Sequence, residues 1–163
     1  MIRYRNLYES EDAQIKLYDI VNYAGHEWYI VRLNGDEAVL LAKNPDFGVS
    51  KFGGAFCDGY YESRIRKVLN SKILPELQSN GANLLVTLLP DRYCRDKVFL
   101  PYEKDVIDAP MQVRKFPQMW PILCDPFDDS ITCIHPDGRE DITAITSECM
   151  IRPAIRVHVE DLG

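Results

Sequence analysis

Two neighbouring stretches rich in β-branched and aromatic residues, 27–33 and 36–42, predict a β-hairpin near the N-terminus. Asn34-Gly35 joins them, and this dipeptide tolerates the positive φ angles of a type I′ turn. A two-residue turn there places Arg32 opposite Glu37 and alternates the remaining side chains between two faces. Both faces are mostly apolar. We therefore expect the hairpin to be covered on both sides.

A single amphipathic helix is predicted over about 63–78. Ser63 is a suitable N-cap, and Arg64, Lys67 and Ser71 point away from the apolar stripe. Pro75 is expected to end or kink the helix, because proline removes a backbone donor. The stripe at helical spacing consists of Ile65, Val68, Leu69, Ile73 and Leu77.

The rest of the chain reads as short strands and loops. Gly and Pro residues mark 43–62 as a loop, and 103–108 has the pattern of a helical turn. One helix among many short, mostly antiparallel strands predicts an α+β fold in one compact domain, 1–163, with 1–14 as a peripheral N-terminal extension. The further strands are expected at 84–89, 97–100, 131–135, 142–145 and 151–159.

Composition narrows the choice of partners. The chain has 163 residues, 46% hydrophobic and 27% charged, which is typical of a globular domain. Its formal net charge of -6 argues against nucleic acid as a partner. The N-terminus has no apolar run of signal-peptide length, and no stretch approaches the length of a membrane helix. We expect a cytoplasmic protein that does not insert into membranes.

Five cysteines are widely spaced and form no Cys-x-x-Cys pair. This pattern argues against a zinc cluster and against a disulfide framework. Buried, reduced thiols are the expected state.

An ordered set of motifs resembles a family of bacterial and phage-associated domains of unknown function. The family pattern is a Trp-containing hairpin, a Ser-x-Ile-Arg-x-x-Leu-Asn helix, a Val-Phe-Leu strand and a terminal Arg-Pro-Ala. The chain matches it over about 16–158, and the structural motif residues are Trp28, Ile65, Arg66, Leu69, Asn70, Arg152 and Pro153.

The resemblance implies a fold similar to the C-type-lectin-like and sulfatase-modifying-factor folds. It transfers no activity. Where the family has Trp-Leu-Arg-Ser, this chain has Trp120-Pro121-Ile122-Leu123, so a site formed by that Arg and Ser is not expected here.

The densest group of carboxylates lies in 125–130, and oxygen-rich loops can hold calcium. The chain lacks the Glu-Pro-Asn and EF-hand signatures, so a solvated turn is the simpler explanation. If a ligand site exists, the candidates are Trp120, Asp125, Asp128 and Asp129. His26, His135 and His158 have no second ligand at metal spacing, and no metal or cofactor is predicted.

These observations predict a binding or interaction module with a protein or glycan ligand and no evident catalytic centre. One alternative is a small oxidase-like enzyme related to formylglycine-generating factors, with Cys124 and Cys133 as working residues. Another is a phage-encoded inhibitor that docks on a host protein, which would add the virion as a location.

Arg66 and Arg152 lie inside the two most specific motifs. We expect at least one of them to be buried and bonded to carbonyls or a carboxylate, because a buried charge needs partners. The closing strand that carries Arg152 is expected to lie beside the N-terminal hairpin, with the helix alongside both.

Overall fold

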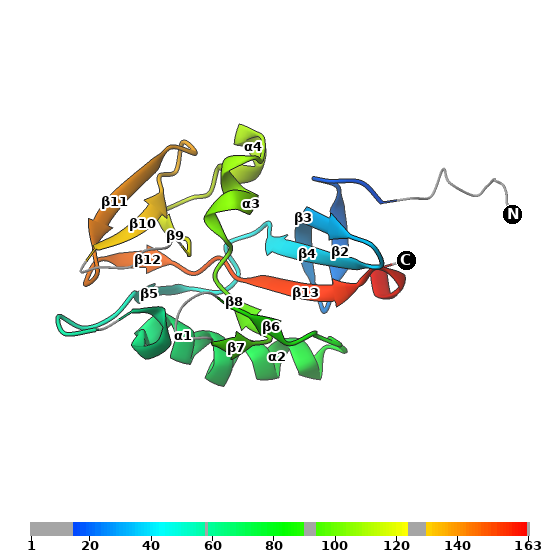
Figure 1. Ribbon diagram of the computed structural model, residues 1–163, viewed down its shortest axis with the longest axis horizontal. Coiled ribbons are helices and arrows are strands. Elements are labelled where there is room, and N and C mark those ends of the chain that lie inside the picture. Colours follow the sequence, from blue (N-terminus) through cyan, green and yellow to red (C-terminus); the bar gives the residue numbers. More distant parts are fainter. Residues whose placement is uncertain (1–14, 58, 90–93, 124–129, 163) are drawn as a thin grey trace, which may run out of the picture.

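The computed structural model describes residues 15–57, 59–89, 94–123 and 130–162 (Figure 1). Its largest sheet has five strands, all antiparallel, in the order β2-β3-β4-β13-β8. The closing strand β13 pairs with β4 of the hairpin and with β8, which confirms that this strand lies beside the N-terminal hairpin. The strands are β2 (Ile20–Tyr23), β3 (His26–Asn34), β4 (Glu37–Ala42), β8 (Val98–Phe99) and β13 (Ala154–His158).

The described residues form three smaller sheets as well, with orders β11-β10-β9, β12-β5 and β6-β7. The predicted strand 151–159 is shorter than expected, because β12 and β13 belong to different sheets and 151–153 connects them. Likewise only β6 forms within 84–89. The elements are β5 (Val49–Lys51), β6 (Thr87–Leu88), β7 (Arg95–Asp96), β9 (Trp120–Pro121), β10 (Ser130–Ile134), β11 (Glu140–Ala144) and β12 (Glu148–Met150).

The β3–β4 hairpin forms, but its turn lies one residue later than predicted, so Arg32 and Leu33 pair two positions further along β4. Asn34 pairs with Glu37, so the turn residues are Gly35 and Asp36, and Gly35 has a φ of 63°. A β-bulge between Ile30 and Arg32 then shifts the register again. The expected pair of Arg32 with Glu37 is therefore absent. The prediction of burial on both faces is confirmed, since residues from Trp28 to Val31 and from Ala38 to Ala42 are buried.

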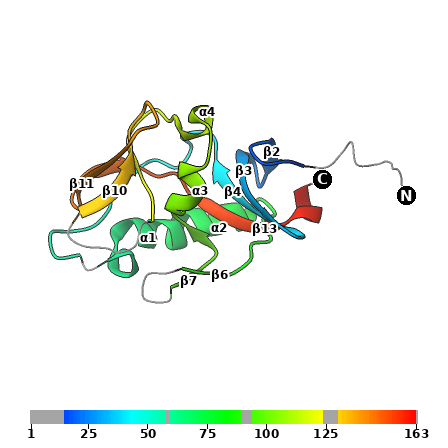
Figure 2. The same cartoon turned by 45° about the horizontal axis from the view of Figure 1, so that its top comes forward.

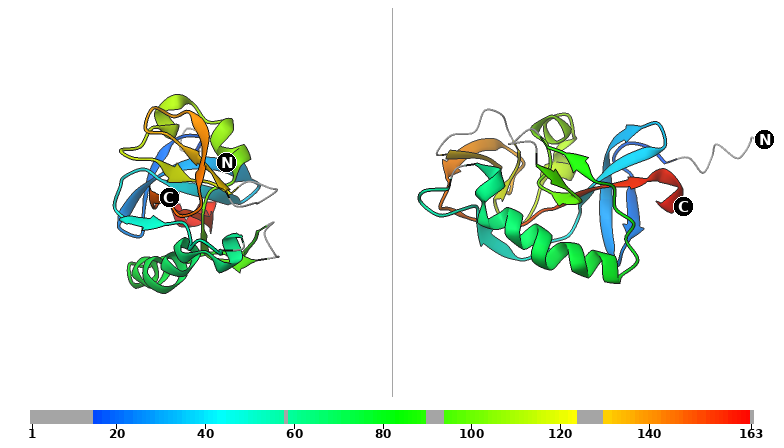
Figure 3. Two further views of the ribbon diagram at one scale, coloured as in Figure 1. Left: turned by 90° about the vertical axis from the view of Figure 1, so that its left-hand side faces the viewer. Right: turned by 60° about the horizontal axis from the view of Figure 1, so that its bottom comes forward.

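The main helix comprises 16 residues over 64–79 and runs as one continuous rod (Figure 3). Ser63 caps it as predicted: its Oγ accepts a hydrogen bond from Arg66 N at 3.1 Å and donates one to Tyr60 O at 2.7 Å. The stripe is buried except for the half-buried Val68. The rod consists of α1 (Arg64–Val68), a π-helical segment (Leu69–Ile73) and α2 (Leu74–Ser79), preceded by a 3-10 turn (Tyr60–Glu62).

Pro75 does not end this helix. The π-helical segment lies directly before it, and the proline occupies the first turn of α2. A proline ring lacks the N–H that an α-helix needs and crowds the carbonyl four residues earlier, so a locally wider turn accommodates it. Sequence reasoning anticipated the disturbance but not its form.

Two short helices, α3 (Glu103–Ile107) and α4 (Met111–Arg114), lie between the β10–β11 hairpin and the five-stranded sheet (Figures 1 and 2). The main helix lies on the opposite side of that sheet (Figure 1). A last 3-10 turn spans Val159–Leu162. The described residues thus form one compact α+β domain, and none of its helices is long and apolar enough to span a bilayer.

Candidate ligand-binding site

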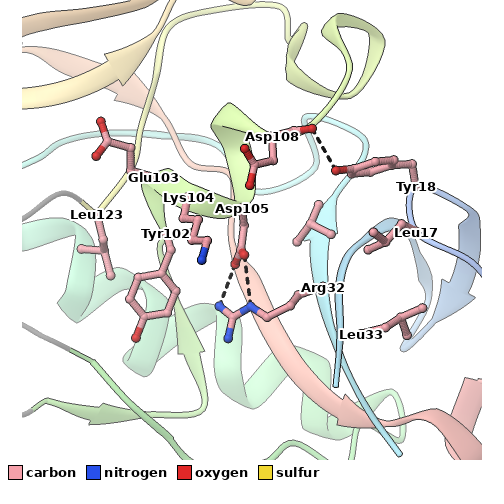
Figure 4. A pocket seen from close by; sticks show the side chains of 11 residues that line it. Leu17, Tyr18, Arg32, Leu33, Tyr102, Glu103, Lys104, Asp105, Asp108 and Leu123 are labelled. Atoms are coloured by element: carbon pink, nitrogen blue, oxygen red, sulfur yellow. Dashed lines mark hydrogen bonds and ion pairs between the residues drawn. The ribbon is translucent and has the colours of Figure 1, made fainter. Parts of the chain in front are cut away.

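A cavity of about 720 Å³ opens between β3 and α3 (Figure 4). This is within the size range of small-molecule pockets, which combine an apolar surface with a few placed polar groups. Its walls come from residues just before β2, from the bulged part of β3 and from α3. The lining residues are Leu17, Tyr18, Val31, Arg32, Leu33, Tyr102, Glu103, Lys104, Asp105, Asp108 and Leu123.

The β-bulge explains how one strand supplies consecutive side chains to this cavity. In a regular strand, neighbouring residues point to opposite faces. Here Val31, Arg32 and Leu33 all line the cavity, and the register shift lies between Ile30 and Arg32. A bulge re-aims side chains in this way and is frequent beside functional sites.

An ion pair joins the two walls. Arg32 Nε lies 3.1 Å from Asp105 Oδ1, and Arg32 Nη2 lies 2.7 Å from Asp105 Oδ2. The guanidinium carbon lies 5.3 Å from the centroid of the Tyr102 ring. Asp105 is buried, and its hydrogen bond raises the pKa of Arg32 above the ordinary value. Such a bidentate pair fixes the geometry of both partners.

Tyr18 lies at the rim with a φ of 70°, which is rare for a bulky residue. Three hydrogen bonds hold it there. Its N–H donates to Ile30 O at 2.6 Å, its hydroxyl donates to Asp108 O at 3.0 Å, and Asp19 O accepts from Ile30 N at 3.0 Å. Burial, then Asp108 and Asp105, raise the pKa of the Tyr18 hydroxyl. The hydroxyl therefore stays protonated as a donor at neutral pH.

The side-chain carboxyls of Glu103, the first residue of α3, and Glu140, at the start of β11, lie within hydrogen-bonding reach of each other. Two ionised carboxylates only accept hydrogen bonds, so a bond between their side chains requires one proton. That bond, followed by burial and the charge of Glu103, raises the pKa of Glu140 to about 7, while Arg114 opposes the shift. The pair joins the cavity wall to the β10–β11 hairpin.

A second cavity of about 190 Å³ lies next to the first and shares Arg32 and Tyr102 with it. Arg156 lines this second cavity and is bonded on several sides. It pairs with Glu37, and its Nε and Nη2 donate to Thr87 Oγ1 and Val86 O. Glu37, the predicted partner of Arg32, thus binds Arg156 instead.

Trp120, the one predicted site residue that the structure describes, does not line this cavity. Trp120 is fully buried on β9, and its Nε1 donates to Arg114 O at 3.2 Å. Asp125, Asp128 and Asp129 lie outside the described residues, so the acidic ligand site stays a prediction, as does the solvated turn. Sequence reasoning did not single out Arg32, Tyr18 or α3 as parts of a site. The only signal was the cluster of charges in Glu103-Lys104-Asp105 and Asp108.

The prediction that at least one of the two motif arginines is buried and bonded is confirmed. Arg152 is fully buried, and its Nε donates to Ala42 O at 2.7 Å. Arg66 binds the buried Asp96 through two bonds, of 2.9 and 2.8 Å. Asn70 Nδ2 donates to Arg66 O at 2.8 Å. These two motif segments therefore belong to the scaffold and not to the cavity.

The oxidase alternative gains no support from the described thiols. Cys133 is fully buried on β10, and burial raises its thiol pKa to about 11. Burial raises the pKa of Cys149 to about 12. A thiolate is the reactive form of cysteine, so both thiols are poorly reactive at neutral pH. Cys124 lies outside the described residues.

His26 bridges three elements at a distance from the cavity. Its Nδ1 lies 3.0 Å from Asp46 Oδ2 and its Nε2 lies 3.1 Å from Glu76 Oε2. The ring centroid of Phe47 lies 4.6 Å from that of His26. Among the described residues, no three His, Cys, Asp or Glu side chains gather in a way that could hold a metal ion.

Comparison with protein-family models, with curated proteins and with solved structures finds no match to this chain, so the cavity and its residues stand as the evidence on function.

Proposed function

We propose that the protein is a binding module whose ligand is a small molecule held in the cavity between β3 and α3. The scaffold would be of the C-type-lectin-like kind, with the recognition surface on loops and short helices, and the protein would act in the cytoplasm. The Arg32–Asp105 pair would order the polar side of the site, and Leu17, Val31 and Leu33 would contact the apolar part of the ligand.

One observation carries this proposal: two independent backbone irregularities meet at one cavity. The left-handed Tyr18 costs on the order of 1–3 kcal/mol, and the bulge at Val31 interrupts the strand pairing beside it. Both belong to elements that line the same space. Strained residues that the surrounding structure holds in place cluster at binding sites.

The test is an NMR titration of the ¹⁵N-labelled protein with a library of sugars, amino acids and small carboxylic acids. We expect one ligand class to shift the amide signals of Val31, Arg32 and Tyr102 together. Leu33→Trp adds bulk to the cavity wall and should abolish those shifts. Ile142→Trp adds the same bulk at an exposed position of β11 and should leave them unchanged. Shifts that map elsewhere, or normal binding by Leu33→Trp, would remove the cavity from consideration.

A further inference from the structure

We propose that the cavity recognises a small zwitterion of the amino-acid type, with its carboxylate on Lys104, its ammonium on Asp108 and its apolar side chain against the leucine-rich wall. This inference rests on the proposed function and adds the chemical class of the ligand.

Five charged side chains line the cavity: Arg32, Glu103, Lys104, Asp105 and Asp108. Arg32 and Asp105 neutralise each other through two hydrogen bonds. Glu103 is bonded to Glu140. No ion pair or side-chain hydrogen bond joins Lys104 or Asp108 to another residue in the described chain. One cation and one anion are therefore available to a ligand.

The spacing of Lys104 and Asp108 suits the two ends of a small ligand. Lys104 and Asp108 are four residues apart on α3, so their side chains emerge on the same face one turn apart, with Cβ atoms about 5–6 Å from each other. Both extend beside the cavity in Figure 4. A lysine N-terminal to its acidic partner is the weaker order for a direct pair at this spacing. The two charges thus remain separate and can each meet one end of a ligand.

Asp108 lies at the C-terminal end of α3, which is the negative end of the helix. It is the C-cap residue of α3, and its carbonyl accepts the Tyr18 hydroxyl. The carbonyl oxygens at a helix end are the negative end of its peptide dipoles, and a carboxylate there adds to that charge. An ammonium group with several N–H donors fits this end of the cavity better than a carboxylate does.

One wall of the cavity is apolar. Leu17, Val31, Leu33 and Leu123 line the same cavity, and Leu17 is 47% exposed. An aliphatic or aromatic side chain placed here would remove this surface from water, which is the main favourable term in binding of apolar groups. A wholly charged ligand would leave the apolar wall exposed to water. A wholly apolar ligand would remove water from Lys104 and Asp108 without supplying new polar contacts.

The experiment uses isothermal titration calorimetry with L-leucine, L-phenylalanine and leucylphenylalanine, each also as its N-acetyl and its C-terminal amide derivative. We expect the parent zwitterions to bind about tenfold more tightly than either derivative, because each derivative removes one charge-assisted contact. Lys104→Met should erase the preference for the parent over the amide. Asp108→Asn should erase the preference for the parent over the N-acetyl derivative.

Matched controls are Lys72→Met and Asp161→Asn, which remove exposed charges from the main helix and the last 3-10 turn. Both should keep the full preferences. Lys104 and Asp108 are exposed in the free protein, so their variants should fold normally. If the derivatives bind as well as the parents, or if no zwitterion of the panel binds up to millimolar concentration, the inference is overturned. The proposed function then still stands when another compound class shifts Val31, Arg32 and Tyr102, and it fails when none does.

Discussion

The guanidinium carbon of Arg152 lies 4.5 Å from the centroid of the Trp120 ring, and Phe116 flanks it from another side at 4.4 Å. The side chain is fully buried, yet its two terminal nitrogens have no hydrogen-bond partner among the described residues. Burial lowers the pKa of Arg152 to about 9. The aromatic faces and one carbonyl thus compensate a buried cation that lacks a carboxylate.

Replacing Arg152 with Met should change the free energy of unfolding by less than about 1 kcal/mol, because it keeps the volume and removes an incompletely bonded charge. Arg152→Ala should lose about 3 kcal/mol, because it leaves a cavity between the two rings. Urea denaturation of the two variants checks this. A loss of equal size in both would show that the charge itself stabilises the fold.

Breaking the ion pair at the cavity should destabilise the protein more than breaking a surface pair. Asp105→Ala removes a buried carboxylate from Arg32, whose side chain is 41% exposed, so we expect a loss of about 2 kcal/mol. Arg139→Ala removes one partner of an exposed pair with Asp137 and should cost less than about 0.5 kcal/mol. Equal losses measured by urea denaturation would contradict the structural role of the Arg32–Asp105 pair.

The shared proton between Glu103 and Glu140 predicts a pH dependence. The pKa of Glu140 is raised from 4.5 to about 7, so the stabilisation it brings is complete below pH 4.5 and is lost as pH rises through 7. Glu140→Gln keeps a donor toward Glu103, so its melting temperature should fall less than that of the wild type as the pH rises through 7. Glu148→Gln on β12 is the control. Identical pH profiles of wild type and Glu140→Gln would refute the shared proton.

His26 should stabilise the fold in its charged form. Burial lowers its pKa, but hydrogen bonds to Asp46 and Glu76 outweigh that effect and raise the pKa above 6.5. Its contribution is therefore complete below pH 6.5 and is lost as pH rises through the raised value. Melting temperatures measured from about pH 5 to pH 9 should fall less steeply for His26→Gln. His158→Gln, which removes an imidazole from β13, serves as the reference. If the melting temperature of His26→Gln fell with pH as steeply as that of the wild type, His26 would not stabilise the fold through Asp46 and Glu76.

Local signals in the sequence were sufficient for the hairpin, for the helix with its Ser63 cap and for the burial of Arg152. Each depends on residues close together in the chain, or on a charge inside an apolar strand. The register of the hairpin was predicted wrongly, because the turn begins one residue later than the Asn-Gly signal suggests and because the bulge at Val31 has no local signature. The π-helical segment before Pro75 was likewise not predicted.

The candidate site could not be predicted, since its contacts are distant in sequence. Arg32 and Asp105 are 73 positions apart, and Tyr18 and Asp108 are 90 apart. A single sequence offers no signal that such distant residues meet. The prediction centred on Trp120 and the acidic residues after it instead, because aromatic and acidic side chains stand out locally. Trp120 proved to be a core residue, stacked on Arg152.

The position of β13 has a consequence for biosynthesis. This strand, from the end of the sequence, lies between β4 and β8 in the largest sheet. While the chain is still emerging from the ribosome, β4 and β8 therefore lack the neighbour that joins them, and their apolar faces stay open to chaperones or to other nascent chains. The sheet can therefore close only once β13 has been synthesised, and this pairing of distant segments should make folding slow for a domain of this size.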